Sequence, residues 1–187
     1  MVFEELGRHY LDDALLTLGK QRALAERALE QVDDAAFFAA PDPESNSLAV
    51  IVKHVAGNQR SRWRDFLTSD GEKPERHRDT EFELSRADSR AALMDAWRRG
   101  WDLTLETIGA LAPRDLQRTV TVRGEPHTAL QAIQRQLAHY AQHAGQIVFL
   151  AKHWAGPRWR TLSIPKGRSA DHEVARDGSV YRPAGDP

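Results

Sequence analysis

The apolar residues of one long segment recur at alternating intervals of three and four positions. The series consists of Leu130, Ile133, Leu137, Tyr140, Ala144, Ile147, Ala151 and Trp154. This spacing places all of its members on one face of an α-helix. The segment at about 128–152 therefore predicts a long amphipathic helix, whose apolar face must be covered by other parts of the chain.

Three further segments show helical periodicity. The sequence predicts helices over about 3–32, from Asn46 or Ser47 to about 67, and over about 89–111. The prolines of "AAPDPES" end the first of these helices, and Pro113 ends the last. Four such helices predict an all-α protein, with a four-helix bundle as the natural architecture and an irregular helical domain as the alternative.

Two connecting segments have features of their own. Residues 68–88, "TSDGEKPERHRDTEFELSRAD", are charged and have no clean period. About 20 extended residues reach about 65 Å, whereas a 20-residue helix is about 30 Å long, so this connector allows the second and third helices to run parallel. Further on, Val120 and Val122 alternate with threonines before an Arg-Gly turn, which predicts a short hairpin.

The composition excludes several classes of protein. A formal net charge of -1 gives no general reason to expect nucleic acid as a partner. No apolar run approaches the roughly 20 residues of a membrane span, and the polar start "MVFEELGRHYLDD" does not resemble a signal peptide. With 0 Cys, any metal must be held by nitrogen and oxygen ligands. We expect a cytoplasmic protein without a membrane partner.

Three histidines occupy equivalent positions beside apolar faces. His139 and His143 are one helical turn apart, and each directly precedes a member of the apolar series. His54 precedes Val55 in the second helix, which puts it at the same kind of border. Three neutral imidazoles that leave one position open are a standard arrangement for catalytic zinc. The alternative is that these are incidental polar residues at the edge of a core.

The surroundings of the histidines limit the chemistry. A metal could lower the pKa of a bound water to about 7, or polarise a substrate or a thiol. Neither helix carries an acidic residue from Ser47 to Arg64 or from Thr128 to Lys152, so a divalent ion would keep its double charge and favour hydroxide, thiolate or carboxylate. Tyr140 stands where the H-E-x-x-H motif has its glutamate, which excludes that class of metalloprotease.

Other polar residues could reach the same site. Asn58 and Gln146 follow the histidines at helical spacing, and we interpret both as ordinary polar helix residues. "RDTEFE" offers Asp79, Glu81 and Glu83 as a general base. The preferred interpretation is structural, with Asp79 and Glu83 paired to arginines that pin the connector.

Two more groups have competing interpretations. Arg60, Arg62 and Arg64 at the end of the second helix could bind an acidic cosubstrate, but a solvated face is the preferred reading. Trp97 and Trp101 are expected to fill the core or a dimer seam. The single glycine of the second helix, Gly57, is compatible with a close approach by another segment.

Four segments together resemble the DinB/YfiT-like superfamily of metalloenzymes. They are "VKHVAGNQRSRWRDFL", "RDTEFE", "AHYAQHAGQI" and "WRTLSIPKGRS". The resemblance extends over about residues 3–169, and we expect one domain over 1–169 followed by a polar tail at 170–187. It implies a four-helix bundle in up-down-down-up order, with the long crossover between the second and third helices.

The resemblance also carries implications for the site. It implies that His54, His139 and His143 bind one divalent metal ion, zinc or nickel, and that the protein forms a homodimer. Related proteins act as thiol-dependent S-transferases and isomerases on small molecules, with a low-molecular-weight thiol as cosubstrate. Three functions therefore stay open at this point: a metal-dependent transferase or hydrolase, a stress-related metal-binding bundle without turnover, and a helical dimerisation protein.

Overall fold

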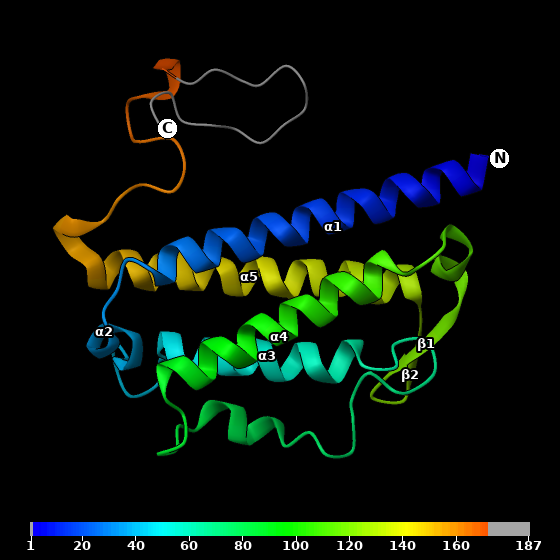
Figure 1. Ribbon diagram of the computed structural model, residues 1–187, viewed down its shortest axis with the longest axis horizontal. Coiled ribbons are helices and arrows are strands. Elements are labelled where there is room, and N and C mark those ends of the chain that lie inside the picture. Colours follow the sequence, from blue (N-terminus) through cyan, green and yellow to red (C-terminus); the bar gives the residue numbers. More distant parts are fainter. Residues whose placement is uncertain (1, 172–187) are drawn as a thin grey trace.

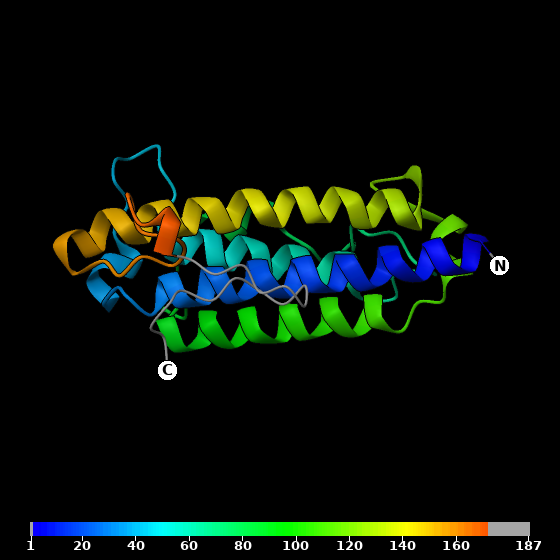
Figure 2. The ribbon, with the colours of Figure 1, turned by 90° about the horizontal axis from the view of Figure 1, so that it is seen from above.

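Four long helices lie side by side and make up most of the molecule (Figures 1 and 2). The computed structural model describes residues 2–171. The long helices are α1 (Val2–Leu29), α3 (Leu48–Trp63), α4 (Arg90–Gly109) and α5 (Ala129–Ala155). The predicted helical class is confirmed, with one small two-stranded sheet added to it.

The long helices pack in two main pairs, α3 with α4 and α1 with α5, and the pairs also contact each other. In Figure 1, α1 and α5 run in one direction, whereas α3 and α4 run in the other. Since α3 and α4 point the same way, the segment between them runs back along their length. We call residues 64–89 of this segment the crossover; it contains one turn of 3-10 helix, η1 (Arg78–Phe82).

The core follows the predicted apolar faces closely. Tyr140, Ile133 and Ile147 are buried on α5, and Trp97 and Trp101 are buried on α4. The core interpretation of the two tryptophans is therefore confirmed. One member of the predicted series is wrong: Leu130 is 39% exposed, because Ala129 and Ile133 occupy the core-facing positions of the first turn of α5.

Side-chain caps fix where the helices begin. The Ser47 hydroxyl accepts a hydrogen bond from the Val50 amide, as expected for the predicted N-cap of α3. The first predicted helix ends earlier than position 32, and a short helix follows that was not predicted, α2 (Asp34–Phe38). Asp33 caps α2, and burial of Phe37 holds it against the core.

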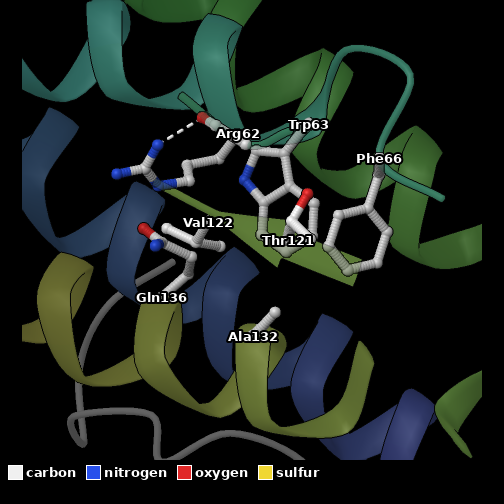
Figure 3. A pocket seen from close by; sticks show the side chains of 8 residues that line it. Arg62, Trp63, Phe66, Thr121, Val122, Ala132 and Gln136 are labelled. Carbon is white, nitrogen blue, oxygen red and sulfur yellow. Dashed lines mark hydrogen bonds between the residues drawn. The ribbon is translucent and has the colours of Figure 1, made fainter. Parts of the chain in front are cut away.

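The predicted hairpin is confirmed. Strands β1 (Thr119–Val122) and β2 (Glu125–Thr128) pair in antiparallel register. Arg123 and Gly124 form the turn with φ angles of 57° and 76°, the left-handed conformation that two-residue hairpins require. Figure 3 shows Val122 beside Trp63 of α3, facing α5. The hairpin thus closes one end of the gap between α3 and α5.

The remaining elements are short. They are the 3-10 turns η2 (Pro113–Gln117), η3 (Gly156–Arg158) and η4 (Ser169–Asp171). After α5, Trp159 and Leu162 pack against the core. Residues 172–187 of the predicted polar tail lie outside the described residues. Among the helices that the structure describes, none is long and apolar enough to span a membrane.

Candidate metal centre

His54 is carried into the interior by α3. Leu48, Val52 and Val55 of this helix are almost fully buried, and His54 itself is only 5% exposed. A buried imidazole needs partners for its ring nitrogens, because an unpaired polar group costs free energy in the interior. His54 has partners on both sides of its ring, in the crossover and on α5.

His139 and His143 lie one turn apart on α5, and both are partly buried. Tyr140 fixes the rotation of this helix about its own axis. Its hydroxyl accepts a hydrogen bond from the Trp63 indole at 3.0 Å and donates one to Asn58 Oδ1 at 3.1 Å. Because α5 is locked to α3 in this way, the residues that flank Tyr140 face the same gap as His54.

The Nε2 atoms of the three histidines converge. The distance from His139 Nε2 is 3.4 Å to His54 Nε2 and 3.1 Å to His143 Nε2, and the candidate ligand atoms of all three lie within 4.8 Å of one another. A tetrahedral zinc ion with Zn–N bonds of about 2.0–2.1 Å holds its nitrogens about 3.3 Å apart. The spacing therefore fits a single small cation.

Two of the imidazoles are oriented by partners on their outer nitrogen. His54 Nδ1 lies 2.9 Å from Glu81 Oε2, and His143 Nδ1 lies 2.8 Å from Gln146 Oε1. Both partner oxygens accept, so each Nδ1 carries the proton and each Nε2 presents its lone pair to the centre. Metal-binding histidines characteristically donate their other nitrogen to an oxygen in this manner.

Charge at the centre favours neutral imidazoles. Burial, followed by the neighbouring His143 and His54, lowers the pKa of His139 to about 3. Burial also lowers the pKa of His143. The Nε2 lone pairs of neutral rings repel one another unless a cation lies between them. Because the lowered pKa of His139 disfavours a proton there, a metal ion is the cation that suits this position. The donor set thus fits a divalent ion of the zinc type.

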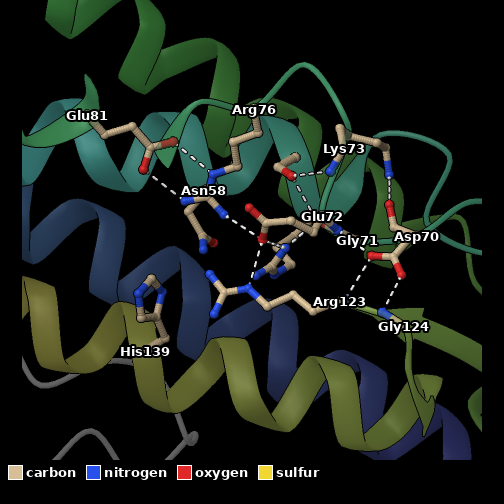
Figure 4. Close-up of polar contacts among 12 residues, drawn as sticks. Asn58, Asp70, Gly71, Glu72, Lys73, Arg76, Glu81, Arg123, Gly124 and His139 are labelled. Carbon is tan, nitrogen blue, oxygen red and sulfur yellow. Dashed lines mark hydrogen bonds and ion pairs between the residues drawn. The ribbon is translucent and has the colours of Figure 1, made fainter. Parts of the chain in front are cut away.

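Glu81 is held as a carboxylate by the crossover. Arg76 donates two hydrogen bonds to it, from Nε and Nη2, each at 2.8 Å. Burial alone would raise the pKa of Glu81, but the hydrogen bonds from Arg76 and His54 outweigh it and lower the pKa. Figure 4 shows this pair on the crossover side of the gap, with His139 on the α5 side.

The structure sorts the residues predicted for the crossover. Of the three acids in "RDTEFE", the buried one that contacts a histidine is Glu81. The Asp79 side chain is 99% exposed, and its contact with Arg78 at 3.8 Å is long and open to water. Glu83 is exposed as well. The prediction that Asp79 and Glu83 pin the crossover is therefore wrong, since Glu81 and Arg76 do so.

Three further interpretations are corrected or refined. Gln146 is more than an ordinary polar residue, because it orients His143. Asn58 is buried and binds the Tyr140 hydroxyl, so its contact supports the helix pairing. Arg62 does not lie on a solvated face: it is buried and donates to the Gly71 carbonyl and, at 2.9 Å, to Glu72. Arg60 and Arg64 are exposed, as expected.

Sequence reasoning did not find Arg76 as the partner of Glu81. One signal pointed toward this contact: Gly57 follows His54 by three residues, so it lies on nearly the same helix face. A Cβ atom at Gly57 would be only 2.3 Å from Glu81 Oε1. The glycine is therefore the position at which the crossover approaches α3.

A polar pocket of about 180 Å³ adjoins the histidines. Its lining consists of His54, Asn58, Arg62, Arg76, Arg78, Arg123, Arg135, Gln136 and His139. A separate small cavity between the hairpin and α5, lined in part by Trp63 and Val122 (Figure 3), measures about 10 Å³ and has room for at most one water. The larger pocket gives the metal centre an open side.

Comparison with known proteins gives a match over most of the chain. A family model described as "Protein of unknown function (DUF1572)" matches residues 5–168, which include all of the residues at the centre. A search of curated proteins finds no match.

Proposed function

The chain belongs to the DUF1572 family of proteins of unknown function, and we propose from the geometry of its centre that it is a metal-dependent enzyme. His54, His139 and His143 are the proposed ligands of one divalent ion, zinc or nickel. The observation that carries the proposal is the convergence of three Nε2 atoms beside a pocket. An open side next to three protein ligands distinguishes catalytic from structural zinc sites.

The chemistry of the site follows from what lines the pocket. When bound, the ion would act as a Lewis acid toward an oxygen or sulfur atom of a substrate. Glu81 and Gln146 hold protons at the Nδ1 atoms of His54 and His143, which keeps the opposite nitrogens free. No carboxylate lines the pocket among the described residues, so the chain offers no acidic general base there.

This lack of a base favours a nucleophile that ionises readily. A free thiol has a pKa of about 8.5, and a thiol coordinated to such an ion is deprotonated outright, whereas a water bound to the ion keeps a pKa of about 7. The thiol therefore loses its proton with less help from the protein. We therefore propose transfer to or from a low-molecular-weight thiol as the reaction class. Hydrolysis of a small-molecule substrate is the second reaction of the same centre.

We further assign the fold to an up-down-down-up four-helix bundle of the DinB/YfiT-like superfamily. The directions of the four long helices in Figure 1 support this assignment. The placement of the ligands on α3 and α5, the second and fourth long helices, supports it as well. A homodimer and a cytoplasmic location stay predictions from the sequence.

A second candidate function is metal binding without turnover. The hydrogen bond between His54 and Glu81 ties the centre to the crossover, so an ion there would also stabilise the fold. In this alternative, a stress-related bundle uses the metal to hold the crossover in place.

Metal analysis and a reaction screen test the proposal. We expect about one zinc or nickel ion per chain, with loss of the ion in His139→Ala. His153→Ala is the matched control, because His153 is an exposed residue near the end of the same helix. A metal content that His139→Ala leaves unchanged would overturn the site.

The metal-loaded protein is then screened with thiols and small electrophilic substrates. Turnover that His139→Ala abolishes supports the enzyme. Full metal occupancy with no turnover of any thiol or ester supports the alternative instead.

A further inference from the structure

The pocket beside the histidines has an unusual lining for its size. Every side chain that lines it is polar or charged, and five of them are arginines contributed by four segments. Arg62 comes from α3, Arg76 and Arg78 from the crossover, Arg123 from the hairpin turn and Arg135 from α5. Segments far apart in the sequence thus direct guanidinium groups into one space.

Among the described residues, two carboxylates accept hydrogen bonds from these guanidinium groups. Glu72 accepts hydrogen bonds from Arg62, Arg76 and Arg123, and Glu81 accepts from Arg76. Asp79 lies 3.8 Å from Arg78, but it is fully exposed, so water screens this pair. Positive charge therefore remains in excess in the pocket, before any metal ion is counted.

The arginines fall into two groups by their contacts: Arg62 and Arg76 form the first, and the other three form the second. The buried Arg62 and Arg76 are held by glutamates and form the inner wall. Arg135 makes no hydrogen bond or ion pair within the part of the chain that the structure describes. Arg123 donates to Glu72 through Nε, at 3.2 Å, and its terminal nitrogens have no acceptor among residues 2–171. Arg78 stacks over Phe82 at 4.9 Å.

The backbone places Arg123 and Arg135 for this role. Asp70 accepts hydrogen bonds from the Arg123 and Gly124 amides, at 2.9 and 2.8 Å, and so fixes the turn that carries Arg123 (Figure 4). Arg135 precedes His139 by four residues on α5, so the two side chains share a helix face. An anion bound by Arg135 would lie next to the imidazole centre.

We propose that this pocket binds the phosphate or carboxylate group of an anionic small molecule through Arg78, Arg123 and Arg135. Guanidinium groups suit such groups because they donate two parallel hydrogen bonds to paired oxygens. A single water needs about 10–15 Å³, so a pocket of about 180 Å³ admits a small ligand. The inference deepens the proposed function. It rests on that function for the reaction that the bound molecule undergoes at the metal centre.

Binding of simple anions tests the inference apart from activity. Calorimetric titrations with inorganic phosphate and with malonate are made on the metal-loaded protein, at constant ionic strength. We expect saturable binding of at least one anion, weakened about tenfold in Arg135→Gln and about tenfold in Arg123→Gln. Arg98→Gln is the matched control, since Arg98 is an exposed α4 residue that pairs with Asp95, and it should bind as the unaltered protein does.

The metal-free variant His139→Ala separates this inference from the proposed function. Anion binding that persists in this variant and still depends on Arg135 supports the arginine pocket, whatever the metal does. Binding that disappears together with the metal, and that Arg135→Gln leaves unchanged, places the anion on the ion and overturns the inference. A protein that holds a full complement of metal but binds neither anion also overturns it, while the metal centre itself stands.

Discussion

The Glu81 carboxylate lies directly against the backbone of Gly57, where the crossover meets α3. A Cβ atom at position 57 would come within 2.3 Å of Glu81 Oε1 and 2.7 Å of its Cδ. The same carboxylate accepts hydrogen bonds from His54 and Arg76. The absence of a side chain at one position therefore sets the orientation of a proposed ligand at another.

Gly57→Ala should displace Glu81 and disturb His54. The carboxylate must move, because real Cβ atoms do not approach other atoms at 2.3 Å. Loss of a hydrogen-bond partner behind a metal-binding histidine typically weakens metal affinity by about 10- to 100-fold. We expect a loss of at least about tenfold in a competition titration with a chromogenic zinc chelator.

Gly19→Ala provides the control for this substitution. Gly19 lies inside α1, and a Cβ atom there would meet nothing within 4 Å. The change should raise the free energy of unfolding by about 0.5–1 kcal/mol, as alanine does in a helix interior, and leave metal affinity unchanged. Equal metal affinities for both variants would show that Glu81 does not orient His54.

Residue positions indicated that the three histidines border the core, and the family resemblance named them together as metal ligands. Each precedes a buried residue, Val55, Tyr140 or Ala144, and helical geometry places such residues at the border of a core. Glu81 could not be singled out among three acids in "RDTEFE", because the segment has no period that tells which side chain points inward. Its burial depends on how the crossover folds back, which is a tertiary property.

At the scale of elements, the hairpin and the start of the crossover form one unit. Asp70 accepts hydrogen bonds from the amides of Glu72, Arg123 and Gly124, at 2.6, 2.9 and 2.8 Å. The Gly71 amide donates to the Thr121 carbonyl at 2.8 Å. Burial alone would raise the pKa of Asp70, but the three backbone donors lower it to about 2.

Asp70→Asn should destabilise the protein in a pH-dependent way. The folded pKa of Asp70, about 2, lies below its ordinary value of 3.8. Its contribution is therefore fully present above about pH 4 and is lost as the pH falls toward about 2. We expect the free energy of unfolding, measured with urea at pH 6, to be about 1 kcal/mol lower in the variant. A fully buried charged hydrogen bond would contribute more, but water screens this partly exposed carboxylate.

Between pH 4 and pH 2 the two proteins should converge in stability. Asp79→Asn is the matched control, since Asp79 is 99% exposed, and it should follow the unaltered protein at every pH. A constant difference between Asp70→Asn and the unaltered protein across this range would contradict the assigned role of the backbone donors.

The regular elements were more predictable than the segments between them. Ser47 and the apolar spacing located α3, and alternation of Val120 and Val122 located the hairpin. The short helix α2 was missed because its cap, Asp33, lies only four residues after the end of α1, and its five residues are too few to show a helical period. Each link between crossover and hairpin that involves Asp70 or Gly71 has a backbone group on at least one side, and backbone groups leave no pattern in a sequence.

At the scale of the molecule, the proposed centre joins three separate parts of the fold. His54 comes from α3, the other two histidines come from α5, and Glu81 brings the crossover to them. An ion held there would bind the folded protein and not the unfolded chain. Its binding energy would then add to the free energy of unfolding.

Removal of metal should lower the melting temperature and loosen the crossover. Metal at 100 times its Kd adds about 2.7 kcal/mol, and 1 kcal/mol shifts the Tm of a chain of this length by about 2–4 °C. We expect chelation by EDTA to lower the Tm by about 5–10 °C in a differential scanning experiment. Limited trypsin digestion should also cut sooner after Arg78, which lies in the crossover.

His139→Ala is the control for chelation, because it removes one proposed ligand and leaves the crossover intact. EDTA should then leave both the Tm and the digestion pattern of this variant unchanged. An equal effect of EDTA on both proteins would mean that the chelator acts elsewhere.

The crossover supplies Arg76, Arg78 and Glu81 to the site but none of the three imidazoles. All three imidazoles therefore come from α3 and α5, whereas two of the three proposed anion-binding arginines, Arg78 and Arg123, come from connecting segments. Loops tolerate sequence change better than packed helices do. Descendants of such a protein can acquire new substrates by altering the chain around Arg78 and Arg123, while α3, α5 and the Arg76–Glu81 pair preserve the same underlying chemistry.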